Sequence, residues 1–185
     1  LEGTTNMYGG ITITPAQLPP QNTNFKEILV NSINQWKNEN LRLVWLEIPV
    51  DLASFVPIAV DLGFSYHHAQ KNTIMMTLPL SKETHIPNYA THNLGAGAVV
   101  INEKNELLVV NERFRRDQTK PYFKLPGGAV NPAENISKAA EREVMEETGI
   151  YTQFIGIVCL RHRHGFRFGT SDLYIVCRLK PLSKE

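Results

Sequence analysis

The chain has 185 residues, of which 42% are apolar and 20% are charged, and its formal net charge is +1. This length suits one large domain or two small ones, and a nearly neutral chain gives no electrostatic reason to expect nucleic acid or an acidic membrane as a partner. No apolar run reaches the roughly 18 residues that cross a bilayer, and the first residues lack the basic and apolar regions of a signal peptide.

The first half of the chain alternates between strand and helix patterns. The expected strands are residues 8–14, 41–49, 64–69 and 73–80. The expected helices are residues 25–36, with Thr23 or Asn24 as N-cap, and residues 52–62, with Gly63 as C-cap. The resulting β-α-β-α-β-β order can bury a small core of its own.

Residues 81–90 are polar, contain proline and lack periodicity, so we expect a linker there between domains at 7–80 and 91–185. In the second domain the strand-like runs are residues 94–101, 106–111, 151–160 and 171–179. Cys159 and Cys177 lie in two of these runs without any metal-ligand spacing. They are therefore expected to be buried free thiols in a reducing compartment such as the cytoplasm.

Residues 136–148 predict a helix with an unusual charge distribution. Asn135 is the expected N-cap and Gly149 the expected C-cap. At about 100° per residue, the apolar stripe of the helix consists of Ile136, Ala140 and Val144. The same wheel places three carboxylates at the edge of that stripe, namely Glu143, Glu146 and Glu147. It turns Glu141, Met145 and Lys138 toward water.

The three carboxylates of this cluster repel one another, and the helix dipole also disfavours anions at the C-terminal end of a helix. Arg142 can pair with Glu146 but does not neutralise three charges. Divalent cations such as Mg²⁺ or Mn²⁺ would neutralise these charges, because such ions prefer carboxylate and carbonyl oxygens as ligands. A solvated acidic helix face is the alternative, and the overlap with the apolar stripe argues against it.

The residues around this helix resemble the signature of the Nudix hydrolase family. The signature positions are matched at fixed spacing by Gly128, Glu134, Arg142, Glu143, Val144, Glu146, Glu147, Gly149 and Ile150. Residues 122–128, "YFKLPGG", resemble the approach to this signature. The first half resembles the pre-Nudix domain of one subfamily, which includes ADP-ribose and NADH pyrophosphatases.

This resemblance implies an enzyme that hydrolyses the pyrophosphate of a nucleoside diphosphate linked to a group X, with Mg²⁺ or Mn²⁺ as cofactor. It implies metal binding by Glu143, Glu146, Glu147 and the main-chain carbonyl of Gly127. Glu146 or Glu147 would act as the base, and Arg142 would orient the carboxylates. Further roles are structural for Gly128, Glu134 and Gly149, and phosphate contact for Lys124, for which simple solvation is an equal alternative.

The loop at residues 161–172 offers candidate substrate contacts. Arg161 and His164 could grip phosphate, and Phe168 could stack on adenine, but a solvated basic loop explains the same residues equally well. A zinc site formed by the histidines of this loop is not expected, because no third ligand is spaced with them. The basic segment 113–120 is either a lid or a polar hairpin loop.

The resemblance also implies the fold, which is α/β of the α+β kind. We expect an acetyltransferase-like pre-Nudix domain followed by an α/β/α Nudix sandwich that stops before its C-terminal part. The substrate is expected to be a small nucleotide, ADP-ribose or NADH first, with CoA or capped RNA as alternatives. A catalytically weak nucleotide-binding regulatory or scaffold protein is the competing hypothesis, and the first domain would mediate homodimer contacts or shape the substrate pocket.

Overall fold

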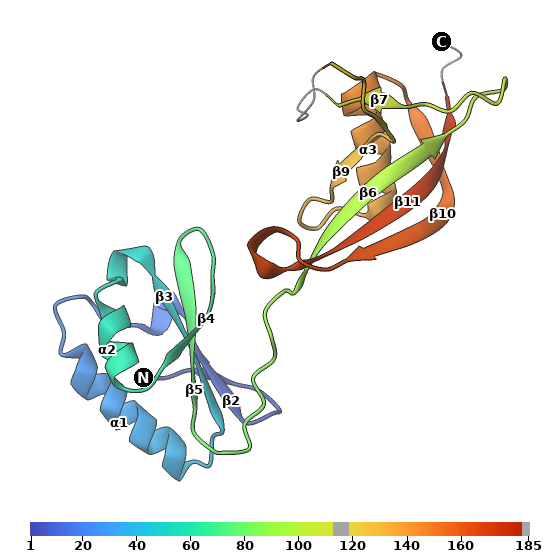
Figure 1. The fold of residues 1–185 in the computed structure, drawn as a ribbon. Helices are drawn as coiled ribbons and strands as arrows, with labels where there is room; N and C mark the ends of the chain where they lie inside the picture. The colour runs from blue at the N-terminus through green and yellow to red at the C-terminus, as the bar shows by residue number, and fades with distance from the viewer. Residues whose placement is uncertain (113–118, 183–185) are drawn as a thin grey trace. The chain divides into compact units, whose positions relative to one another are not determined.

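The fold was analysed in a computed structural model, which describes residues 1–112 and 119–182. The chain forms two compact units, Leu1–Tyr89 and Ala90–Glu185, and each is considered by itself (Figure 1). The division falls within the segment 81–90 that was predicted as a linker. In the described part of the chain, no helix is both long enough and apolar enough to cross a membrane.

The first unit contains a five-stranded sheet and two α-helices. Its elements are β1 (Thr4–Thr5), β2 (Gly10–Ile13), α1 (Phe25–Asn38), β3 (Leu43–Pro49), α2 (Phe55–Asp61), β4 (Ser65–Ala69) and β5 (Thr73–Pro79). The strand order is β1-β2-β3-β5-β4, with β2 and β3 parallel and the other pairs antiparallel. From β2 onward the element order is the predicted β-α-β-α-β-β.

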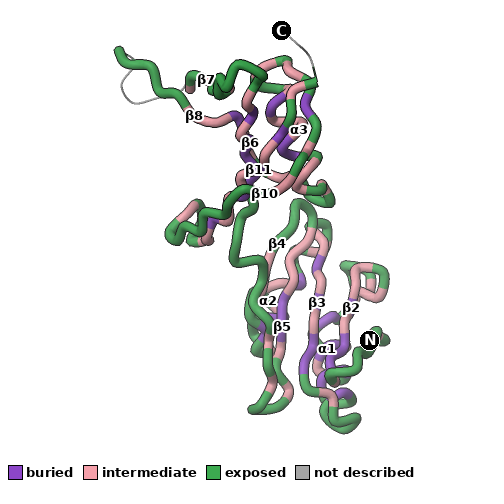
Figure 2. Tube along the Cα trace, turned by 90° about the vertical axis from the view of Figure 1, so that its right-hand side faces the viewer, coloured by how far each residue is buried: buried purple, intermediate pink, exposed green. Residues whose placement is uncertain are grey.

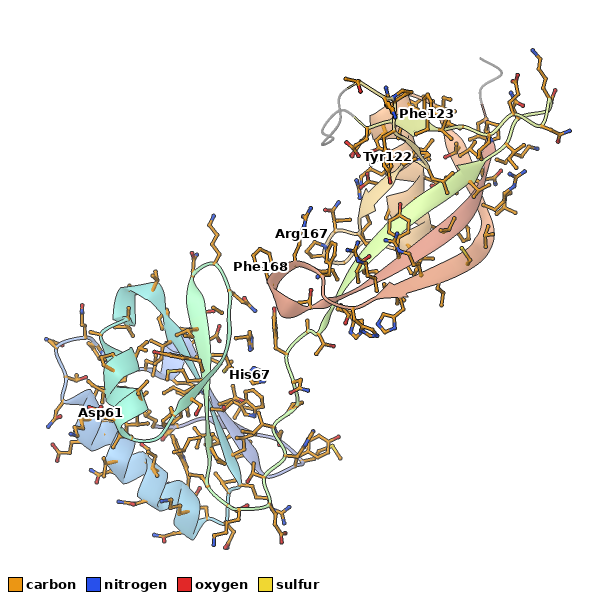
Figure 3. The ribbon with its side chains drawn as sticks, viewed as in Figure 1. Asp61, His67, Tyr122, Phe123, Arg167 and Phe168 are labelled. Atoms are coloured by element: carbon orange, nitrogen blue, oxygen red, sulfur yellow. The ribbon has the colours of Figure 1, made fainter. Side chains whose placement is uncertain are left out.

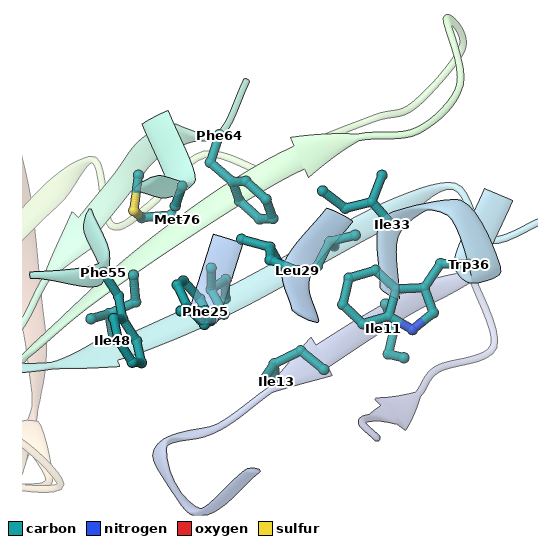
Figure 4. Packing of buried hydrophobic residues seen from close by; sticks show 13 residues of the cluster. Ile11, Ile13, Phe25, Leu29, Ile33, Trp36, Ile48, Phe55, Phe64 and Met76 are labelled. Atoms are coloured by element: carbon teal, nitrogen blue, oxygen red, sulfur yellow. The ribbon is translucent and has the colours of Figure 1, made fainter. Parts of the chain in front are cut away.

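The core of the first unit lies between the sheet and its helices. Side chains of β3 alternate, so that Val44, Leu46 and Ile48 are buried. Figure 4 shows residues of α1 and α2 facing the apolar side chains of the sheet. The rings of Phe25 and Phe55 stack at 3.9 Å between centroids, which joins the starts of the two helices.

The second unit is built on a four-stranded sheet. Its elements are β6 (His92–Val100), β7 (Val110–Asn111), β8 (Phe123–Lys124), β9 (Gly127–Ala129), α3 (Ile136–Thr148), β10 (Thr152–Arg163) and β11 (Ser171–Pro181). The strand order is β10-β11-β6-β9, in which β11 and β6 are parallel, and β7 pairs with β8 separately. The mixed α/β class is confirmed, and of the two expected helix layers the described residues contain the one formed by α3.

Small side chains let α3 pack closely on this sheet. Ala96, Ala98 and Val100 of β6 are buried against Ala140 and Val144 of α3, in a cluster that also includes side chains of β11. Buried residues, purple in Figure 2, therefore occur in both units, so each has a core of its own.

Two expectations for the second unit were wrong. The strand predicted at residues 106–111 is a strand only at Val110–Asn111, because residues before it make a single bridge, Ile101 to Leu107, instead of a continuous ladder. Cys177 is buried, but Cys159 is exposed because it lies on β10, the edge strand of the sheet. Both thiols are free.

The packing of the first unit yields a stability prediction. Replacing the fully buried Leu29 with alanine should lower the free energy of unfolding by about 2–5 kcal/mol, because it leaves a cavity in the core. Urea unfolding followed by tryptophan fluorescence measures this unit, since both tryptophans of the chain, Trp36 and Trp45, lie in it. The exposed Val50→Ala control should change little, and an equal loss in both variants would contradict the packing.

Candidate functional site

Helix α3 begins and ends where the sequence predicted. Asn135 occupies the N-cap position with an extended backbone, although its side chain makes no capping hydrogen bond. Gly149 adopts a left-handed conformation with φ of 75° at the C-cap, and its N–H donates to the carbonyl of Met145. Between these caps one turn of the helix carries Glu143, Glu146 and Glu147 on neighbouring positions.

Arg142 connects three carboxylates and the preceding strand. Its Nε and Nη2 donate to the two carboxylate oxygens of Glu134 at 2.8 and 2.9 Å, a bidentate ion pair. Its Nη1 donates to Glu143 at 2.8 Å and to Glu146 at 3.1 Å. Nη2 also donates to the carbonyl of Ala129 at 3.0 Å. A planar guanidinium with five N–H groups can make all these bonds at once, whereas a lysine ammonium cannot.

Glu134 braces the loop that precedes α3. Besides Arg142, its carboxylate accepts the backbone N–H of Asn131 at 2.9 Å. The hydrogen bonds from Arg142 and the Asn131 backbone lower the pKa of Glu134 to about 2. The carboxylate therefore stays ionised and keeps residues 129–134 tied to the helix.

Gly127 and Gly128 bring the backbone of β9 close to the acidic face of α3. The N–H of Gly127 donates to Glu147 Oε2 at 2.9 Å. Gly127 has a φ of 151°, and a Cβ on it would lie 2.5 Å from the carbonyl oxygen of Ala96. A Cβ on Gly128 would lie 2.6 Å from both carboxylate oxygens of Glu143. A larger residue at position 127 would clash with the backbone of β6 and with Tyr174, and one at position 128 would displace the Glu143 carboxylate.

Lys124 of β8 contacts the same acidic face. Its ammonium lies 2.9 Å from Glu112 and 3.4 Å from Glu147. Partial burial alone would lower the pKa of Lys124, but the hydrogen bond to Glu112 and the charge of Glu147 outweigh this and raise the pKa. The structure therefore brings Lys124, which the sequence left between a phosphate ligand and a solvated residue, to the carboxylate cluster.

The oxygen donors suit a hard divalent cation, but they do not form a finished metal cage. Glu143, Glu146 and Glu147 have side chains that are 13%, 59% and 28% exposed, and each accepts a hydrogen bond from within the chain. Among the described residues, no three His, Cys, Asp or Glu side chains converge on one metal position. Together with Glu134 and Glu112 they amount to five carboxylates in contact with two cations, Arg142 and Lys124. Negative charge is therefore in excess among these groups, and divalent cations would balance it.

Tyr174 of β11 lies next to this cluster and was missed in the sequence. Its ring occupies the space left by Gly95, Gly97 and Gly127, where an added Cβ would clash with it. Burial raises the pKa of Tyr174, and the charges of Lys124, Glu147 and Arg161 also act on its hydroxyl. The signal available in the sequence was the alternation of Gly95 and Gly97 in β6, which leaves one face of a strand open to a ring from a neighbouring strand.

The candidate substrate residues of the 161–172 loop do not form one group. The guanidinium of Arg161 lies 5.1 Å from the ring centroid of Tyr174 and 3.3 Å from Asp172. His164 instead contacts Ser171 through Nδ1 at 2.9 Å. Phe168 is 99% exposed with a φ of 56°. Figure 3 places it at the end of the β10–β11 hairpin, away from Tyr122 and Phe123 of the β8 region.

The helical wheel predicted that Glu141 points into water, but in the structure its carboxylate has two partners. Its carboxylate accepts the backbone N–H of Phe154 at 2.8 Å and pairs with Lys138 at 2.8 Å. The bond to Lys138 lowers the pKa of Glu141. A wheel gives direction around the helix axis but not the path of the following strand, and β10 passes Glu141. Of the basic segment 113–120, which was considered either as a lid or as a polar hairpin loop, residues 113–118 lie outside the described residues.

The Glu134–Arg142 pair predicts an acid-dependent loss of stability. Because the folded chain holds the pKa of Glu134 at about 2, below its ordinary value of 4.5, the unfolded chain binds more protons between these values. This contribution is present above about pH 4.5 and is lost as the pH falls toward 2. As the pH falls across this range, the melting temperature of the Glu134→Gln variant should decrease less than that of the parent. The Glu83→Gln control in the linker should follow the parent, and parallel curves for all three would contradict the assignment.

Comparison with known proteins finds family models and relatives that cover nearly the whole chain. A family model for the NUDIX domain matches residues 91–185, and one described as the Nudix hydrolase domain matches residues 1–80. Nudix hydrolase 8 of Arabidopsis thaliana is 38% identical over 96% of this chain and 49% of its own length, and human nucleoside diphosphate-linked moiety X motif 6 is 38% identical over 99% of this chain and 60% of its own. The chain thus spans about half to two thirds of these relatives.

A solved structure, a NUDIX hydrolase from Nitrosomonas europaea, is 27% identical, covers 50% of this chain and 61% of its own, and has a TM-score of 0.42. The assignment rests on the family models and on the identity over nearly the whole chain. The chain belongs to the Nudix hydrolase family.

Proposed function

We propose that this chain hydrolyses the pyrophosphate bond of a nucleoside diphosphate linked to a second group, releasing a nucleoside monophosphate and the phosphorylated second group. The observation that carries the proposal is the set of carboxylates held by Arg142 and Lys124 beside the glycine pair of β9. An excess of negative charge next to open backbone is what a metal-bound diphosphate requires.

A divalent cation, Mg²⁺ or Mn²⁺, would be held by Glu143, Glu146, Glu147 and the carbonyl of Gly127. Such an ion neutralises the diphosphate charge and makes water more acidic. The contacts of Lys124 to Glu147 and of Arg142 to Glu146 are long or exposed compared with the Arg142–Glu134 pair. They are therefore the contacts that exchange for a cation at least cost, while the Glu134 pair keeps the loop in place.

The protein groups then divide the remaining tasks. Glu146, whose side chain is the most exposed of the three, is the first candidate to accept a proton from the attacking water, and Glu147 the second. Arg142 acts through the carboxylates that it orients. Lys124, once its bond to Glu147 is released, can donate to a phosphate oxygen.

The substrate is proposed to be a small nucleotide, either the nucleotide sugar ADP-ribose or the dinucleotide NADH. Arg161 and Tyr174 support this, since a guanidinium and a phenol next to the carboxylate cluster can bind a second phosphate or a ribose. Contacts of His164 and Phe168 with the substrate are also proposed. The human relative is named for moieties linked to nucleoside diphosphates. CoA and capped RNA remain alternative substrates.

We also propose a cellular compartment and a domain organisation for the protein. The free thiols Cys159 and Cys177 support a reducing compartment such as the cytoplasm. A pre-Nudix domain at 7–80, a linker at 81–90 and a Nudix domain at 91–185 are consistent with the separate cores. We further propose that the first domain mediates homodimer contacts or shapes the substrate pocket.

A second candidate function is nucleotide binding without efficient turnover. It is favoured by the internal partners of the carboxylates and by the lack of a converged metal position among the described residues. In this case Lys124 and Arg142 would keep their carboxylate contacts when a nucleotide binds.

One experiment separates the two functions. The protein is incubated with ADP-ribose, NADH, CoA and capped RNA in Mg²⁺, in Mn²⁺ or in EDTA, and nucleotide release is measured by chromatography. We expect metal-dependent AMP release from ADP-ribose or NADH, and a loss of about 10²–10⁴-fold in turnover for Glu146→Gln or Glu147→Gln. The Glu83→Gln control should retain the parent rate.

The opposite result is equally clear. If no substrate yields a metal-dependent nucleotide product while calorimetry shows that ADP-ribose binds, the chain is a nucleotide-binding protein and not a hydrolase.

A further inference from the structure

Three histidines from two distant parts of the sequence meet at one end of the second unit. His92 is the first residue of β6, and His162 and His164 lie at the end of β10 and just after it. The Nε2 atoms of His92 and His162 are 2.9 Å apart, although 70 positions separate the two residues in the chain. The rings of His162 and His164 follow at 4.3 Å between centroids.

Strand register places these histidines on one face of the sheet. His92 is level with Ser171, and His162 is level with Leu173, so the two point to the same side as the apolar core residues of β11. Arg161, which precedes His162, is level with Tyr174 and points to the other side. The histidine cluster is therefore separate from the side of the sheet on which Arg161 and Tyr174 lie.

Neighbouring hydroxyl groups engage the other ring nitrogen of two of these histidines. His92 Nδ1 lies 2.8 Å from the hydroxyl of Thr91, and His164 Nδ1 lies 2.9 Å from the hydroxyl of Ser171. Metal-binding histidines commonly show this arrangement, since a hydrogen bond at one nitrogen fixes the ring and leaves the other nitrogen for the metal. Among the described residues, His164 Nε2 has no hydrogen-bond partner.

We propose that His92, His162 and His164 bind one transition-metal ion through their Nε2 atoms, with Zn²⁺ as the first ion to test. Imidazole nitrogens suit Zn²⁺, Cu²⁺ and Ni²⁺ and not Mg²⁺, which prefers oxygen ligands. Two nitrogens bound to one tetrahedral zinc ion lie about 3.3 Å apart, because each Zn–N bond is about 2.0–2.1 Å long. The pair at 2.9 Å therefore needs a shift of only a few tenths of an ångström.

The third ligand has to move further. No three His, Cys, Asp or Glu side chains in the described ranges already converge on one metal position, so His164 must turn its Nε2 toward the pair. His164 is exposed and follows the last residue of β10, which allows this rotation. Binding would tie the β10–β11 hairpin to the start of β6, an additional link between segments far apart in sequence.

The test is a calorimetric titration of the chain with Zn²⁺ in excess Mg²⁺, which occupies carboxylate sites. One Zn²⁺ should bind per chain, and Co²⁺ in its place should give the visible absorption of nitrogen-ligated cobalt. His92→Ala and His162→Ala should each weaken this binding by at least about tenfold. Their unfolding temperatures in EDTA should equal that of the parent, which shows that the variants fold.

The matched control is His67→Ala in the first unit. His67 also lies next to a second histidine, with its Nδ1 2.7 Å from that of His68, but its Nε2 is already bonded to the carbonyl of Pro87. This variant should bind Zn²⁺ as the parent does. Unchanged binding in both His92→Ala and His162→Ala, an equal loss in His67→Ala, or displacement of Zn²⁺ by Mg²⁺ would each overturn the proposal.

Discussion

The second unit depends on the bonds of one guanidinium group, that of Arg142. It joins the loop before α3 through Glu134, the strand β9 through the carbonyl of Ala129, and the acidic helix face through Glu143 and Glu146. Carboxylates so close together would otherwise repel one another and pull the loop and helix apart. Because Arg142 is charged at every relevant pH, its bonds to Glu134 and Ala129 do not depend on a bound cation.

The glycines and the sheet are arranged around this group. The N–H of Gly127 donates to Glu147, and Gly128 lies so close to the carboxylate of Glu143 that a Cβ there would clash with it. On the other side of β6, glycines make room for Tyr174, which brings a phenol and the nearby Arg161 close to the acidic cluster. The carboxylate face and the proposed substrate face thus arise from the same close approach of backbone segments, which is consistent with the proposal of a diphosphate ligand.

The sequence predicted what depends on local spacing and missed what depends on the paths of distant segments. The limits of α3 followed from helical periodicity and from Gly149, and the carboxylate cluster followed from its i, i+3, i+4 spacing. Glu141 was placed in water because the wheel contains no information on β10. The contact between His162 and His92 could not be read from spacing, because 70 positions separate the two residues in the chain.

Metal binding at the acidic face can be measured without turnover. Titration with Mn²⁺ in the absence of nucleotide, followed by electron paramagnetic resonance, counts the ions that the protein removes from solution. If Glu143, Glu146 and Glu147 hold the cation, the parent binds Mn²⁺ and a variant with glutamine at all three positions does not. Equal Mn²⁺ affinity in parent and variant would contradict a metal site on α3.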